Sequence, residues 1–185
     1  MSMKIERTET VAVIVDYQEK LMPVMNKTEE ILHNAEILME GLRILGIPMV
    51  VTQQYPKGLG ETVPELQSII KEAGEVPIID KIRFSGFDDI QSYLQAYEPQ
   101  KKYAIVCGVE AHICVLQTVI DLIENGYTAV LVTDCISSRK EHDCLCAIER
   151  AKQEGAIVTT YEALLFELLQ KAGTEESRKI QKLIR

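Results

Sequence analysis

Hydrophobic and polar residues along this chain follow two patterns, short continuous apolar runs and longer segments with helical spacing. Residues 11–15 form an apolar run rich in β-branched side chains, which is typical of a strand buried on both faces. Residues 28–46 instead repeat apolar side chains every three or four positions, which predicts an amphipathic helix. Thr28 is the expected N-cap of this helix, and Gly46 is the residue expected to end it.

The same alternation continues along the chain and predicts six strands separated by helices. The predicted strands are 11–15, 47–52, 76–79, 103–109, 128–133 and 156–159. The predicted helices are 28–46, 64–73, 88–96, 111–124, 141–154 and 162–171. Strands that alternate with helices through short connections form a parallel sheet covered on both faces. We therefore expect a three-layer α/β/α sandwich around a six-stranded, mainly parallel sheet, which is a Rossmann-like fold.

Length, composition and charge narrow the class of protein. A chain of 185 residues without a repeat, linker or low-complexity tract predicts a single domain over 1–185. The net charge of −8 and the lack of a long Lys/Arg block argue against nucleic acid as a partner. Residues 1–10 lack the apolar stretch of a secretory signal, and no apolar run reaches the roughly 18 residues that span a bilayer. We expect a cytoplasmic protein with no membrane partner.

The cysteines are odd in number and lack paired spacing, which indicates reduced thiols rather than a disulfide framework. They are Cys107, Cys114, Cys135, Cys144 and Cys146. Cys144 and Cys146 form a CxC, but without a second pair the simpler interpretation is packing on a helix rather than a zinc site. Cys135 follows the fifth predicted strand, where packing is favoured over the alternative of a second accessible thiol.

Chemically active residues follow several predicted strands at their carboxyl ends, where parallel sheets bind ligands. Asp16 follows the first strand, Lys81 the third, and Cys114 lies in the first helical turn after the fourth. A helix N-terminus and a nearby ammonium both favour a thiolate. At about 4 Å and an effective dielectric near 20, the ammonium contributes roughly 4 kcal/mol. We therefore predict an ionised Cys114 nucleophile with Asp16 as proton acceptor.

Each of these residues also has an ordinary structural interpretation. A cysteine on an apolar helix is usually a core residue, a strand-end aspartate often caps a helix, and a lone lysine is usually solvated. The joint occurrence of the three residues within longer motifs favours the catalytic interpretation.

Three segments carry that joint pattern, VIVDYQEK, KIRFSGF and CGVEAHICV. In order and spacing they resemble the three motifs of the isochorismatase-like cysteine hydrolases. The resemblance extends from about residue 10 to the C-terminus. The segments TQQYPKGLGETVPEL and IQKLI are especially similar to the eukaryotic isochorismatase-domain-containing subfamily and its bacterial relatives.

The resemblance implies roles for the matching residues. Asp16 becomes the general base and acid, Lys81 the charge stabiliser and Cys114 the nucleophile. It also implies a cis peptide between Val109 and Glu110, with the N–H groups of Glu110 and Cys114 forming an oxyanion hole. The residues expected to bind substrate flank these positions on loops and are Gln18, Gln54, Tyr55, Phe84 and Ile113. The implied reaction is hydrolysis of a small-molecule amide or ester through a thioester, without a cofactor, in a homo-oligomer of two or more copies.

The chain departs from two other branches of this family. Nicotinamidases bind a metal through an Asp and two His after the second strand, whereas this loop reads TQQYPKGLGETV, so we expect no metal. Isochorismatases that cleave a vinyl ether have Gly where this chain has Cys114.

Alternatives to the covalent mechanism remain open. One is vinyl-ether hydrolysis by acid catalysis through Asp16, and another is a redox-sensing or oligomeric binding protein without turnover. His112 as a partner of Cys114 is disfavoured, because residues two apart on a helix point to different sides.

Overall fold

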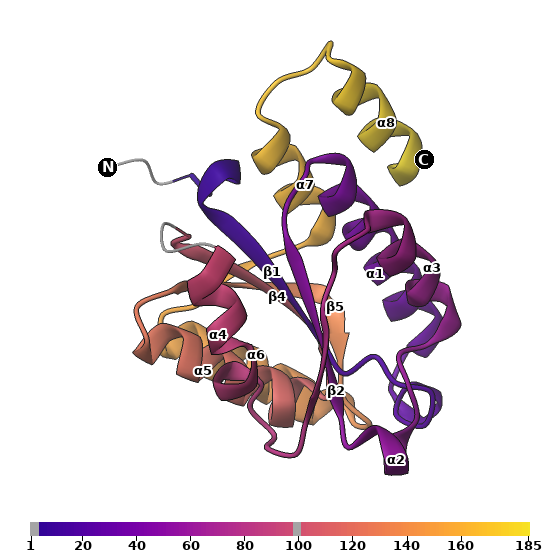
Figure 1. Ribbon diagram of the computed structural model, residues 1–185, viewed down its shortest axis with the longest axis vertical. Helices are drawn as coiled ribbons and strands as arrows, with labels where there is room; N and C mark the ends of the chain where they lie inside the picture. The colour runs from indigo at the N-terminus through magenta and orange to yellow at the C-terminus, as the bar shows by residue number, and fades with distance from the viewer. Residues whose placement is uncertain (1–3, 98–100) are drawn as a thin grey trace.

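The computed structural model describes residues 4–97 and 101–185, and its strands form one sheet with helices on both faces (Figure 1). The six strands lie in the order β3–β2–β1–β4–β5–β6, and each neighbouring pair is parallel. They are β1 (Thr10–Val15), β2 (Met49–Gln54), β3 (Ile78–Lys81), β4 (Tyr103–Val109), β5 (Thr128–Ser137) and β6 (Ile157–Thr159). The expected α/β/α sandwich is confirmed.

Eight α-helices and three short turns lie before, between and after these strands within the described residues. The helices are α1 (Thr28–Ile44), α2 (Pro56–Leu59), α3 (Pro64–Ala73), α4 (Phe87–Tyr97), α5 (Leu116–Glu124), α6 (Glu141–Gln153), α7 (Tyr161–Leu169) and α8 (Glu175–Ile184). The turns are η1 (Arg7–Glu9), η2 (Met22–Val24) and η3 (Ala111–Val115).

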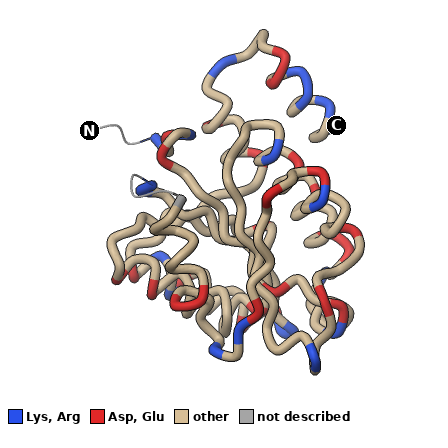
Figure 2. The backbone as a smooth tube through the Cα atoms, viewed as in Figure 1, with Lys and Arg blue, Asp and Glu red and all other residues tan. Residues whose placement is uncertain are grey.

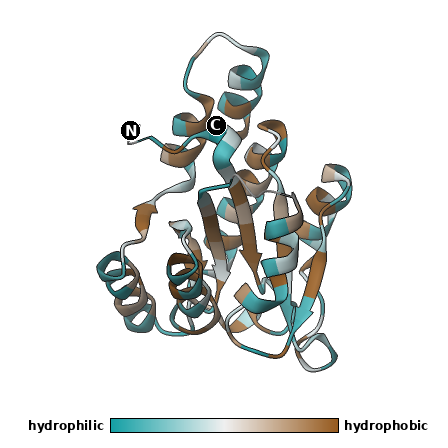
Figure 3. Cartoon of the chain, turned by 60° about the vertical axis from the view of Figure 1, so that its left-hand side comes forward, coloured by the Kyte–Doolittle hydropathy of each residue, from teal (hydrophilic) through white to brown (hydrophobic). Residues whose placement is uncertain are grey.

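Alternate residues of the strands enter two separate apolar cores. In β1, Ala12 and Ile14 pack with α1, α3, α7 and α8, while Val11, Val13 and Val15 pack with α4, α5 and α6. Figure 3 shows the strands as mostly hydrophobic and the helices as mixed, each with apolar and polar positions. This two-sided burial is the reason that the strands appear in the sequence as continuous apolar runs.

The charged residues lie mainly on helices and loops, and most of the central strands are free of them (Figure 2). Among the residues that the structure describes, no helix is both long and apolar enough to cross a membrane.

Several predicted element ends differ from the structure. The second and third strands begin two residues later than predicted. β5 runs on to Ser137 because its register against β4 shifts between Val106 and Gly108. Helices α2 and α8 were not predicted. Thr28 is not the N-cap of α1, because its Oγ1 donates to carbonyls of the preceding turn.

A glycine permits the close approach of β1 and β4 at their carboxyl ends. Gly108 has a φ of 136°, and a Cβ there would lie 2.0 Å from the carbonyl oxygen of Val15. No other residue type fits this contact. Asp16 follows Val15 directly, and the turn that carries Cys114 begins three residues after Gly108. The side chains of Asp16 and Cys114 are therefore brought together by a main-chain contact.

Candidate active site

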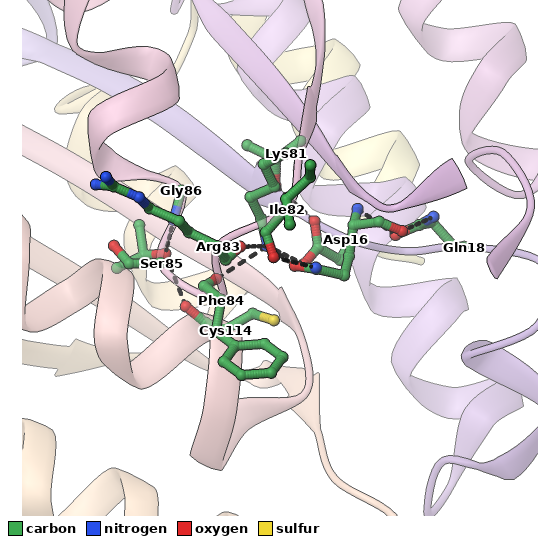
Figure 4. A network of polar contacts seen from close by, with 12 residues as sticks. Asp16, Gln18, Lys81, Ile82, Arg83, Phe84, Ser85, Gly86 and Cys114 are labelled. Atoms are coloured by element: carbon green, nitrogen blue, oxygen red, sulfur yellow. Dashed lines mark hydrogen bonds and ion pairs between the residues drawn. The ribbon is translucent and has the colours of Figure 1, made fainter. Parts of the chain in front are cut away.

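Asp16, Lys81 and Cys114 come from three different strand ends and meet at one place (Figure 4). Asp16 follows β1 in a left-handed conformation with a φ of 52°. Lys81 is the last residue of β3, and Cys114 lies in η3 after β4. Lys81 Nζ is 2.7 Å from Asp16 Oδ2, and neither side chain has exposed surface. The structure thus contains a fully buried ion pair beside a thiol.

The Lys81 ammonium is held by three acceptors. Its Nζ donates to Gln54 Oε1 at 2.7 Å, to the Phe84 carbonyl at 2.9 Å and to the Arg83 carbonyl at 3.2 Å. With Asp16 Oδ2, which lies 2.7 Å from Nζ, four oxygens surround an ammonium that has three protons. Lys81 therefore acts on Asp16 mainly through its charge.

Asp16 keeps one carboxylate oxygen without a regular hydrogen bond. Its Oδ1 accepts from Thr52 Oγ1 at 2.7 Å. Its Oδ2 lies close to Lys81 Nζ, but it has no hydrogen-bond partner of regular geometry among the described residues. Buried carboxylate oxygens are normally hydrogen-bonded, whereas Oδ2 is held by the Lys81 charge and keeps a lone pair that can accept a proton.

Burial and the Asp16 charge favour the protonated form of the Cys114 thiol, contrary to the ionised state predicted from the sequence. Only 6% of Cys114 is exposed, and burial together with the Asp16 charge raises its pKa to about 12. The Lys81 charge lowers this pKa, but it does not outweigh the other two effects. The sequence prediction omitted both burial and the repulsion between a thiolate and Asp16.

The segment around Cys114 begins with a wide turn rather than a regular helix. The Val115 N–H donates to the Glu110 carbonyl at 3.2 Å, a bond that spans five residues. The peptide between Val109 and Glu110 is cis, which confirms that prediction. The Glu110 carboxylate accepts from Arg139 N at 3.2 Å and from Arg139 Nε at 3.0 Å. The side chain of Glu110 therefore holds the segment after β5.

The structure places Gln18 and Gln54 in the scaffold of the site rather than on its rim. Gln18 Oε1 accepts from the Gln54 N–H at 2.7 Å, and Gln18 Nε2 donates to the carbonyls of Gln54 at 2.9 Å and Gly60 at 2.7 Å. Gln54 Nε2 donates to the Ile82 carbonyl at 2.7 Å, and its Oε1 accepts from Lys81. Both amides are thus occupied by protein partners.

Apolar side chains lie exposed on the loops beside Asp16, Lys81 and Cys114. Tyr55 follows β2 and Phe84 follows β3, and each is 55% exposed. Ile113, next to Cys114, is half-buried. The prediction did not include Ile82, which is 83% exposed. Figure 4 shows Ile82 and Phe84 on the short segment between Lys81 and Gly86.

Other candidate side chains point away from Cys114 or are closed to solvent. His112 Nδ1 lies 2.8 Å from Ser138 Oγ, and its Nε2 lies 4.0 Å from Asp143 Oδ2, so its ring faces α6 and the residue that follows β5. Cys135 is fully buried, and burial raises the pKa of its thiol well above the ordinary value. Cys135 therefore packs in the core, the favoured interpretation.

The surroundings of Cys144 and Cys146 do not make a metal site of three or more ligands. Cys146 is exposed on α6, and its Sγ lies 3.6 Å from His142 Nε2. Within residues 4–97 and 101–185, no group of three or more His, Cys, Asp or Glu side chains is arranged to hold a metal ion.

Sequence reasoning missed Thr52, the residue that donates a hydrogen bond to the Asp16 carboxylate. Thr52 pairs with Val15 in the sheet and is fully buried. A threonine inside a strand with two buried faces needs a hydrogen-bond partner, and this was the signal that could have identified it.

The chain is similar to known proteins over nearly its whole length. Residues 10–163 match the Isochorismatase domain. Isochorismatase domain-containing protein 2 of Danio rerio is 39% identical over 177 residues, which cover 95% of this chain and 86% of that one. The secreted isochorismatase effector Isc1 of Phytophthora sojae is 34% identical over 177 residues, 95% of this chain and 84% of that one.

The chain is also similar in fold to a solved structure. The MAR1 ribonuclease from Caenorhabditis elegans superposes with a TM-score of 0.91 and 38% identity, covering 98% of this chain and 92% of that chain. The match to the family domain and the sequence identity to relatives over most of their length are stronger evidence of common family than a similar fold alone. The chain therefore belongs to the isochorismatase family of hydrolases.

Proposed function

We propose that this chain hydrolyses a small-molecule amide or ester through a thioester on Cys114, without a cofactor. The observation that carries the proposal is the buried ion pair of Asp16 and Lys81. Asp16 Oδ2 has no regular hydrogen bond, and the charges of both residues act on the Cys114 thiol. A base with a free lone pair beside a protonated nucleophile is the arrangement that nucleophilic catalysis needs.

The proposed reaction begins from the neutral thiol. As Cys114 Sγ attacks the carbonyl carbon, the S–H proton moves to Asp16 Oδ2 and the carbonyl oxygen becomes negative. We assign the N–H groups of Glu110 and Cys114 to that oxygen, as the family resemblance implies. When the tetrahedral species collapses, the C–N or C–O bond breaks and Asp16 returns the proton to the leaving group.

Water completes the proposed cycle. Asp16 takes a proton from a water molecule while the oxygen of that water attacks the thioester carbon. The C–S bond then breaks, and the proton on Asp16 returns to the Cys114 sulfur while the acid product leaves. Lys81 keeps its three hydrogen bonds throughout and offsets the negative charge that Asp16 or the thiolate carries at each step.

We assign substrate binding to Tyr55, Phe84 and Ile113, which border the catalytic group and leave apolar surface uncovered. Gln18 and Gln54 act through the scaffold, because their amides are bonded to protein. The proposed substrate therefore carries an apolar group next to its amide or ester.

We further propose a cytoplasmic homo-oligomer. All five cysteines are unpaired, as expected in a reducing compartment. The Phytophthora sojae relative is named as a secreted effector, so cell fractionation is the appropriate check of the location. Analytical ultracentrifugation at micromolar concentration tests the assembly, and a single monomer boundary would contradict it.

Turnover and trapping of the thioester test the proposed reaction. Purified protein is assayed with aryl acetates, small amides, a vinyl ether such as isochorismate, and single-stranded RNA. We expect ester or amide turnover with an acyl group on the Cys114 peptide by mass spectrometry, and loss of both in Cys114→Ala.

Three results would reject the proposal in favour of another. Vinyl-ether turnover that survives Cys114→Ala indicates acid catalysis by Asp16. RNA cleavage without ester or amide turnover indicates a nuclease. Oxidation of Cys114 by hydrogen peroxide with no turnover of any substrate indicates a redox-sensing protein.

A further inference from the structure

Thr118 is a buried threonine one turn after Cys114, and its hydroxyl joins two segments of the active site. Its Oγ1 donates to the Cys114 carbonyl at 2.7 Å and accepts from the Gly86 N–H at 2.9 Å. The residue has no exposed surface. A helical threonine that bonds only the carbonyl four residues earlier is common and needs no functional explanation. The bond from Gly86 is different, because its donor belongs to a distant part of the chain.

Gly86 ends the segment that holds the lysine. Residues 82–86 follow β3 and supply the Arg83 and Phe84 carbonyls that bind Lys81 Nζ. Figure 4 shows this segment between Lys81 and Cys114. Thr118 therefore connects the acceptors of the ammonium with the main chain of the nucleophile.

The packing around Gly86 leaves this segment little freedom. A Cβ at Gly86 would lie 3.2 Å from Thr52 Cγ2, 3.7 Å from Lys81 Cδ and 3.7 Å from Thr118 Oγ1. Thr52 in turn bonds Asp16. The buried Gly86 backbone is thus packed among residues that contact all three members of the catalytic group.

We propose that Thr118 is a positioning residue, whose hydroxyl fixes the distance between the segment that binds Lys81 and the turn that carries Cys114. The proposal rests on the proposed function for its catalytic meaning, but the geometry that it describes is independent of any substrate. A threonine suits this role because its single hydroxyl both donates and accepts. Its β-branched side chain also has few rotamers, so the hydroxyl is held in one place.

The consequence of losing this bond is a change at the thiol. Without the Thr118 hydroxyl, the buried Gly86 N–H has no partner, and the segment moves to satisfy it. The Lys81 ammonium, bound to carbonyls of that segment, moves with it. Lys81 lowers the pKa of the Cys114 thiol, so moving the ammonium away leaves less thiolate at a given pH.

The test measures the rate at which iodoacetamide alkylates Cys114 at pH 8, read from the Cys114 peptide by mass spectrometry. Below its pKa, the alkylation rate of a thiol follows its thiolate fraction, so half a pKa unit changes the rate about threefold. We expect Thr118→Val, which keeps the shape and removes the hydroxyl, to react at least about threefold more slowly. Thr118→Ser, which keeps the hydroxyl, should react at the wild-type rate.

A matched control separates positioning from general loss of stability. Thr10 is also fully buried, and its Oγ1 donates to the Glu6 carbonyl at 2.8 Å at the opposite end of β1. Thr10→Val therefore removes a comparable hydroxyl and should leave the alkylation rate of Cys114 unchanged.

Four results would overturn the proposal. The first is alkylation of Cys114 in Thr118→Val at the wild-type rate or faster. The second is alkylation in Thr118→Ser as slow as in Thr118→Val, and the third is an equal slowing in Thr10→Val. The fourth needs no variant and applies even if Thr118→Val does not fold. By NMR of the wild-type protein, the Gly86 amide should exchange its hydrogen slowly, and exchange as fast as in an exposed loop would refute the Thr118 bond. Neither the alkylation rate nor the amide exchange depends on turnover, so both can be interpreted even if the protein does not catalyse the proposed hydrolysis.

Discussion

The buried Asp16–Lys81 pair makes a quantitative prediction about stability. At the observed 2.7 Å between Nζ and Oδ2, two unit charges attract each other by about 6 kcal/mol if the effective dielectric is near 20. Much of that attraction offsets the cost of removing both charges from water. Removing one partner alone leaves the other charge buried without compensation, which typically costs about 3–5 kcal/mol.

The perturbation is a double-mutant cycle with shape-preserving changes. Asp16→Asn and Lys81→Met should each lower the free energy of unfolding by about 3–5 kcal/mol. The double variant leaves no buried charge at the site. Its loss should therefore be smaller than the sum of the two single losses by at least about 2 kcal/mol.

Urea unfolding followed by circular dichroism at pH 7 measures the four proteins of the cycle. The exposed pair of Lys102 and Glu9, with 2.6 Å between Nζ and Oε1, is the control. Its cycle, with Lys102→Met and Glu9→Gln, should show negligible coupling, because water and salt screen exposed charges. If the double variant at Asp16 and Lys81 loses the sum of the single losses to within about 0.5 kcal/mol, the two charges do not act as a pair and our reasoning fails.

Cysteine chemistry gives three further predictions. Asp16→Asn removes a charge that raises the Cys114 pKa, so alkylation of Cys114 at pH 8 should accelerate while turnover is lost; an unchanged rate would separate Asp16 from the thiol. In the native protein at pH 7, limiting iodoacetamide should label the exposed Cys146 before Cys114, and peptide mass spectrometry showing the reverse order would contradict the raised pKa. Burial raises the pKa of Cys107 from 9.0 to about 12, so as the pH rises this thiol ionises in the unfolded chain before it ionises in the folded protein. Its contribution to stability is complete below pH 9 and is lost as the pH rises toward 12. Cys107→Ala should therefore reduce the fall in unfolding free energy between pH 9 and 11 by up to about 1.4 kcal/mol per pH unit, and an unchanged slope in urea titrations would rule out this role.

The sequence was sufficient for the architecture because most of these strands are buried on both faces. A run such as Val11 to Val15 has no polar position to interrupt it, and it lies in the middle of the sheet. The extension of β5 past residue 133 depends on a register shift against β4, and a local pattern carries no information about register. Helix α8 has few apolar positions, and its contacts with α1 and α7 are visible only in three dimensions.

The same distinction applies to the candidate active site. Motif spacing indicated Asp16, Lys81 and Cys114, because the residue types and the strand ends are both local features. It did not indicate the charge state of Cys114, which depends on burial and on the charges of two residues from other strands. Glutamine side chains are equally suited to a rim or to a scaffold. The placement of Gln18 and Gln54 became clear only from the backbone groups that their amides bind.

The contact of Gly108 with Val15 fixes the geometry of the strand ends, whereas the exposed loops beside them are free to change in sequence. The spacing between Asp16 and Cys114 follows from main-chain atoms that touch across β1 and β4, so mutations elsewhere on the surface leave it unchanged. Tyr55, Ile82 and Phe84 lie on exposed loops and contribute little to either core. Exchanging them carries a small cost in stability, because surface positions tolerate substitution. Under the proposed function, these exposed loop residues can therefore be exchanged without disturbing the geometry of the proposed catalytic group.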